Sequence, residues 1–144
     1  MNKVLDAALL LLARREYSAK ELASILLNKY ESEEVATVIT RCLEAGYLSN
    51  ERFTESRIRH RIQQGYGPLW IQQELRRSGI DNELIDSYLS KEDDFWAERA
   101  SQIIEKKFSN KTNDFLKMQR YMYQKGFLAE HIQQALRIVD RSKL

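Results

Sequence analysis

Apolar side chains recur every three or four residues in nearly every window of the chain, the spacing of one buried helix face. No segment shows the sustained apolar–polar alternation that a half-buried strand requires. Five glycines and a single proline also leave few residues for hairpin turns. The pattern therefore predicts an all-α protein, with nine helices along the chain.

The apolar pattern also repeats, with a period of about 45–50 residues. Each copy has two apolar residues four positions apart, followed by a break in the periodicity. The copies read Leu22, Leu26 and Lys29-Tyr30, then Ile71, Leu75 and Gly79, then Met118, Met122 and Gly126. We therefore predict three tandem three-helix repeats, at residues 1–46, 47–90 and 91–144, forming an elongated, curved helical array. Stacked repeats present a long surface, which favours a binding protein over an enzyme with one pocket.

Local residues predict where individual helices begin and end. Ser18 with Glu21 three residues later forms a capping box, and Asn50 is a good N-cap residue. The segment Gly65-Tyr66-Gly67-Pro68 should break a helix, with Pro68 in the first turn of the next one. The predicted helices span 5–15, 19–28, 32–44, 50–64, 68–79, 81–89 and 92–108, then one from about 112 to 126 and one ending at about 140.

Residues that could support catalysis or bind a metal are sparse. The two histidines, His60 and His131, lie far apart without a nearby CxxC motif, so surface positions are expected for both. Cys42 lies among apolar helix positions and is expected in the core rather than as a nucleophile. The only cysteine cannot form an intrachain disulfide, which fits a reducing, cytoplasmic compartment. We expect no enzyme activity, metal or cofactor. We also expect no membrane span, because the apolar stretch Ala7–Ala13, which contains Leu9-Leu10-Leu11-Leu12, is too short.

The net charge of +2 hides an uneven distribution. Residues 80–98 carry seven acidic groups and one basic group, whereas residues 99–144 carry ten basic groups and four acidic ones. The basic segment indicates either a polyanionic partner or an ordinary solvated face. The candidates for contact with DNA or an acidic surface are Lys106, Lys107, Lys111, Lys117, Arg120 and Lys125.

The middle repeat supplies a second set of candidates, which lie off the predicted core stripe. Trp70 shares a helix face with Gln73 and Arg77, a combination typical of binding hot spots. The alternative is that Trp70 packs against a neighbouring repeat. The candidate partner-binding residues are Arg57, Arg59, Trp70, Gln73, Arg76 and Arg77.

Two stretches of the middle repeat resemble the RecX family. They are Tyr47-Leu48-Ser49-Asn50-Glu51-Arg52-Phe53 and the segment from Gly65-Tyr66-Gly67-Pro68 to Gly79-Ile80. Ser18, Glu21 and Leu22 are similar to the family's Arg-Ser-x-x-Glu-Leu start, and Lys125-Gly126-Phe127 is similar to its third-repeat turn. Asn50 stands where the family has an acidic residue, and Thr54 where it has a small alanine. If the acidic residue contacts the partner, Asn50 puts that contact in doubt.

The resemblance implies a regulator, usually an inhibitor, of the RecA recombinase. It implies binding in the groove of the RecA–DNA filament and modulation of ATP hydrolysis, strand exchange and co-protease activity. It also implies tandem three-helix repeats, in agreement with the periodicity. The alternative is a helical module that binds DNA directly through the basic C-terminal third. In either case we expect a monomer.

Overall fold

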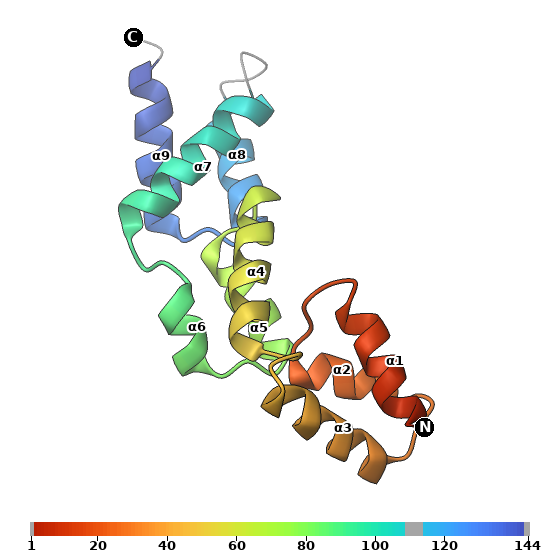
Figure 1. Cartoon of the computed structure of the whole chain (residues 1–144). Coiled ribbons are helices and arrows are strands. Elements are labelled where there is room, and N and C mark those ends of the chain that lie inside the picture. The colour runs from red at the N-terminus through yellow and green to blue at the C-terminus, as the bar shows by residue number, and fades with distance from the viewer. Residues whose placement is uncertain (1, 109–113, 143–144) are drawn as a thin grey trace. The chain divides into compact units, whose positions relative to one another are not determined.

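The computed structural model describes residues 2–108 and 114–142, and within these ranges every regular element is an α-helix (Figure 1). This confirms the all-α prediction. The predicted restart near Thr112 lies outside the described residues. The helices are α1 (Lys3–Leu12), α2 (Ala19–Leu26), α3 (Ser32–Glu44), α4 (Asn50–Gln63), α5 (Pro68–Arg77), α6 (Asn82–Tyr88), α7 (Asp93–Phe108), α8 (Phe115–Gln124) and α9 (Ala129–Ser142).

The local capping signals place most helix starts where the sequence predicts them. The Ser18 capping box is formed at α2, and Pro68 opens α5. The assignment of Asn50 as an N-cap was wrong. The Ser49 hydroxyl caps α4 by accepting the Arg52 N–H at 3.1 Å. The Asn50 side chain instead accepts the Ala19 N–H at 2.9 Å, so it stabilises the first turn of α2.

The chain forms two compact units, and the first comprises Met1–Arg57 with Leu75–Ser87. Helices α1, α2 and α3 pack together around one apolar core in this unit (Figure 1). Cys42 is fully buried there, as predicted, and burial raises the pKa of its thiol. The fully or nearly fully buried side chains of this core are Val4, Ala8, Leu22, Leu26, Val35, Val38, Cys42 and Leu48.

The second unit comprises Ile58–Glu74 with Tyr88–Leu144, and its main helix pair is α7 against α9. Trp96, Met118 and Met122 are buried in its core. Phe115, in the same unit, is 44% exposed. It is the first residue of α8, where a side chain tilts toward the N-terminal end of the helix and past the core.

His131 corrects a second prediction, because it is not on the surface. Its side chain in α9 is only 2% exposed, and Nε2 lies 2.9 Å from the Asp93 carboxylate at the start of α7. The polar residue is therefore buried with a specific partner, which satisfies one of its two ring nitrogens.

The unit boundaries fall within α4, within α5 and before the last residue of α6, so the predicted limits of the three repeats stay a prediction. None of the described helices has both the length and the apolar composition to cross a membrane. In the same residues no cluster of three or more His, Cys, Asp or Glu side chains could hold a metal ion.

Candidate interaction surface

The first unit contains a close contact between the start of α2 and the turn that follows α5. The Ser18 hydroxyl, at the N-cap of α2, donates a hydrogen bond to the Ser78 carbonyl at 2.7 Å. Gly79, the next residue, has φ +85°, and a Cβ at this position would lie 2.7 Å from the Lys20 Cβ. Only glycine combines this left-handed conformation with so close a neighbour.

The second unit contains an equivalent contact one repeat further along. The Gly67 N–H, immediately before α5, donates to the Lys125 carbonyl at 2.7 Å, and the Leu69 N–H donates to the Gly126 carbonyl at 2.9 Å. A Cβ on Gly67 would lie 2.5 Å from the Gly126 carbonyl carbon. In both contacts the N-cap residue of a helix, Ser18 before α2 or Gly67 before α5, donates to the carbonyl of the residue that precedes a turn glycine. The repeat in the sequence therefore corresponds to a contact that occurs twice in the structure.

Aromatic rings and cations surround the junction of the second unit. The Tyr66 and Trp70 rings stack with centroids 3.9 Å apart, and Lys125 Nζ lies 3.7 Å from the Tyr66 centroid. Trp70 is therefore half-buried beside Gly126, the contact expected if it packs against a neighbouring repeat. Its role in partner binding stays a prediction.

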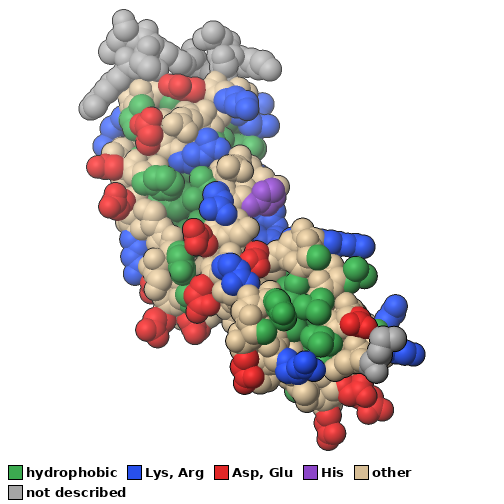
Figure 2. All heavy atoms as spheres, viewed as in Figure 1, with side chains coloured by type: hydrophobic (Ala, Val, Ile, Leu, Met, Phe, Trp, Pro, Cys, Tyr) green, Lys and Arg blue, Asp and Glu red, His purple; other side chains and the backbone are tan. Residues whose placement is uncertain are grey.

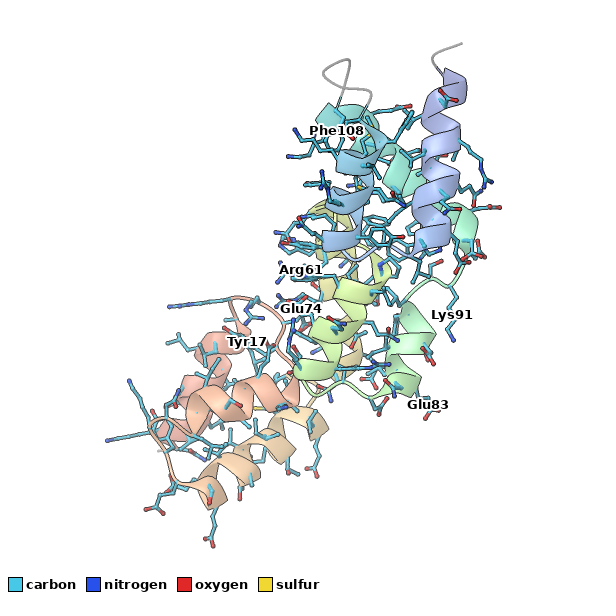
Figure 3. All side chains as sticks on the ribbon, turned by 180° about the vertical axis from the view of Figure 1, so that it is seen from behind. Tyr17, Arg61, Glu74, Glu83, Lys91 and Phe108 are labelled. Carbon is cyan, nitrogen blue, oxygen red and sulfur yellow. The ribbon has the colours of Figure 1, made fainter. Side chains whose placement is uncertain are left out.

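Arg61 and Glu74 join α4 to α5 next to this stack (Figure 3). Two guanidinium nitrogens of Arg61 donate to the two carboxylate oxygens of Glu74 at 2.8 and 2.7 Å. The hydrogen bonds that Arg61 donates to the Glu74 carboxylate raise the pKa of Arg61, so the guanidinium stays charged. Both side chains are mostly buried, and a bidentate pair of this kind fixes the angle between the helices that carry it.

The other candidates of the middle repeat fall in both compact units. Arg57 is half-buried with its guanidinium carbon 5.2 Å from the Phe53 ring centroid. Arg76 is exposed and donates to the Asn82 side chain at 2.9 Å. The remaining members of this set, Arg59, Gln73 and Arg77, are exposed.

Most of the basic candidates lie on the surface of the second unit. Figure 2 shows basic side chains over the C-terminal part of α7, where Lys106 and Lys107 are exposed. Lys107 Nζ lies 4.7 Å from the Tyr121 centroid, so its charge lies over an aromatic face. Lys117 and Arg120 are exposed on α8, and Lys111 lies outside the described residues.

Two exposed residues on α8 are absent from the candidates predicted from sequence. Leu116 is 69% exposed, the most of any large apolar side chain in the described residues, and Tyr123 is 47% exposed. Together with Arg120 they have the i, i+4, i+7 spacing of one helix face. That spacing could have revealed the face, since Met118 and Met122 already define the opposite, buried side.

Comparison with known proteins identifies the family. Models for the first and second three-helix domains of RecX match residues 5–42 and 49–89. The Regulatory protein RecX of Legionella pneumophila is 42% identical, and the alignment covers 100% of this chain and 99% of that protein. The chain belongs to the RecX family. The Vibrio vulnificus Regulatory protein RecX is 32% identical over 91% of this chain and 89% of its own length.

RecX proteins of known structure have the same fold. The crystal structure of RecX from Lactobacillus salivarius matches with a TM-score of 0.82 at 21% identity, covering 96% of this chain and 95% of that one. A second RecX crystal structure matches with a TM-score of 0.80. The all-helical RecX fold is therefore established for this chain independently of its sequence identity to those structures.

Proposed function

We propose that this protein is a non-enzymatic regulator of RecA that binds the RecA filament assembled on DNA. The observation that carries the proposal is the 42% identity, over the full length of the chain, to a protein named for regulation. In this proposal the protein acts in the cytoplasm as a monomer, without a cofactor. Like most of its family it inhibits RecA, lowering the rates of ATP hydrolysis and strand exchange and the co-protease activity.

The exposed residues of the middle repeat are the first candidates for filament contact. Arg59, Gln73, Arg76 and Arg77 are exposed, and Arg57 lies two residues before Arg59. Such side chains can be altered at small cost to folding, because surface substitutions usually change stability by less than about 0.5 kcal/mol.

Titration into a RecA ATPase reaction tests the proposal. The protein is added to RecA, ATP and single-stranded DNA, and hydrolysis should slow at fewer copies of the regulator than of RecA. Binding should also be tighter to filaments held by a non-hydrolysable nucleotide than to free RecA, because a ligand shifts only those states that it binds differently. An unchanged hydrolysis rate at saturation would refute the proposal.

The exposed lysines and Arg120 of the second unit favour one other candidate, a module that binds DNA directly. Its affinity for naked DNA would fall steeply as salt rises, since each phosphate contact releases counterions. A filament-specific regulator would instead bind naked DNA weakly at physiological salt. Measuring the affinity for a labelled oligonucleotide at two salt concentrations separates the two functions.

A further inference from the structure

The outward face of α8 has no cover among the described residues and has the composition of a protein contact. Leu116, Arg120 and Tyr123 lie along one line of the helix, opposite the buried Met118 and Met122. Leucine, arginine and tyrosine side chains combine apolar area with a charge that can pair. Tyrosine and arginine are also the residue types enriched where protein interfaces gain most of their affinity.

The charged residues within α8 are all basic, and the acidic N-cap residue before it, Asp114, accepts the Lys117 N–H. Helix α8, Phe115–Gln124, contains Lys117 and Arg120 and no acidic residue. Lys106 and Lys107, in the last turn of the adjoining α7, add two more exposed cations to the same unit. A partner that buries Leu116 must therefore supply carboxylates as well as an apolar side chain, because an unpaired buried charge is costly.

An apolar residue is exposed at the corresponding position of the preceding repeat. Leu69 is the second residue of α5, as Leu116 is of α8, and it is 41% exposed. Both leucines belong to the second compact unit. The second and third repeats therefore expose the same apolar side chain at equivalent positions, and stacked repeats can form an extended binding surface.

A nucleic acid fits this face less well. Single strands are held by bases that stack on open aromatic rings. Of the three residues of this face only Tyr123 carries a ring, whereas a strand stacks successive bases on several. Two further rings of the unit are already in contact: Tyr66 is stacked on Trp70 and lies under Lys125, and Tyr121 contacts Phe108 and Lys107. The most exposed side chain of the face, Leu116, is aliphatic and gains nothing from a phosphate backbone.

We propose that the outward face of α8 docks a carboxylate-bearing segment of a partner protein. An apolar side chain of the segment covers Leu116 and Tyr123, and its carboxylate pairs with Arg120. The inference rests on the proposed function, in which the partner is RecA assembled on DNA, and it adds the surface and the chemistry of the contact.

The test uses the full chain, with the variants Leu116→Ser and Arg120→Glu and two controls matched in chemistry. Leu10→Ser alters a leucine of α1 that is 65% exposed, and Arg137→Glu reverses an exposed arginine of α9. Circular dichroism and the urea midpoint verify folding. The probes are RecA filaments on single-stranded DNA with a non-hydrolysable nucleotide, and a labelled oligothymidylate alone.

Each of the two α8 variants should bind the filament at least about tenfold more weakly than wild type, whereas both controls should stay within about twofold. Leu116→Ser should leave oligonucleotide affinity unchanged, because it removes no charge. Unaltered filament binding by both α8 variants would overturn this inference and leave the proposed function standing. Loss of oligonucleotide and filament binding in parallel for Arg120→Glu, with no effect of Leu116→Ser, would make the face a phosphate-binding surface. Absence of filament binding by the wild-type protein would overturn the proposed function itself.

Discussion

Replacing Gly67 by alanine should break the junction of the second compact unit. The added Cβ would lie 2.5 Å from the carbonyl carbon and oxygen of Gly126 and 2.6 Å from the Phe127 nitrogen. All three are backbone atoms, so no side-chain rotation can relieve the contact. The turn before α5 and the turn before α9 must instead move apart by about 1 Å to reach an ordinary contact distance.

That movement removes two hydrogen bonds and strains the packing around them. The Gly67–Lys125 and Leu69–Gly126 bonds are 2.7 and 2.9 Å long, and a shift of about 1 Å takes both beyond hydrogen-bond range. Each lost bond costs about 1 kcal/mol, and overpacking adds about 1–3 kcal/mol. The free energy of unfolding should fall by roughly 3–5 kcal/mol.

Gly65→Ala is the matched control, because it lies in the same turn of the same unit. Gly65 has φ +91°, but a Cβ there would meet only Ile103 and Lys125 side-chain atoms, at 3.7 and 3.9 Å. Its cost should be the backbone strain alone, about 1–2 kcal/mol.

Urea unfolding followed by tryptophan fluorescence measures both variants, since Trp70 and Trp96 lie in this unit. With a slope of about 2 kcal/mol per molar urea, Gly67→Ala should lower the midpoint by roughly 1.5–2.5 M. The control should lower it by about half as much or less. A midpoint for Gly67→Ala at or above that of Gly65→Ala would refute the reasoning.

Three further predictions concern the first unit. Asn50→Ala should lower the free energy of unfolding in urea by about 1 kcal/mol, because the Ala19 N–H loses its acceptor. Asn50→Asp retains an acceptor and should cost less than half of that, and equal losses would contradict this role. Ser18→Ala should lower the free energy of unfolding by about 2 kcal/mol, because the same hydroxyl caps α2 and donates to the Ser78 carbonyl. Ser24→Ala, at an exposed position of α2, should change it by no more than about 0.5 kcal/mol, and similar urea midpoints for the two variants would exclude the contact. Cys42 should react with a thiol reagent far more slowly in the native protein than in urea, because its thiol is buried and its raised pKa lowers the fraction of thiolate. Equal rates in the two conditions would show that the thiol is accessible in the native protein.

Prediction from sequence succeeded where the deciding residues lie within one helical turn. Ser18 and Glu21 cap each other three residues apart, and Pro68 needs no partner beyond its own ring to suit a first turn. Prediction failed where the hydrogen-bond partner of a polar side chain lies far away in the sequence. Asn50 has the side chain of an N-cap residue, but its oxygen accepts the Ala19 N–H instead. His131 is buried in the core with Asp93, 38 residues away in the chain, as its hydrogen-bond partner.

The candidate surface divides in the same way. The basic residues of α7 and α8 could be predicted as candidates because charge and spacing are properties of the sequence. The exposure of Leu116, in contrast, depends on which elements pack over α8. The periodic apolar pattern likewise determined that the chain is helical and built from repeats, because helix formation depends on neighbours three and four residues away. Only the tertiary structure decided that Gly67 meets Gly126 and that Ser18 meets Ser78, since contacts between residues so far apart in the chain depend on how whole helices dock.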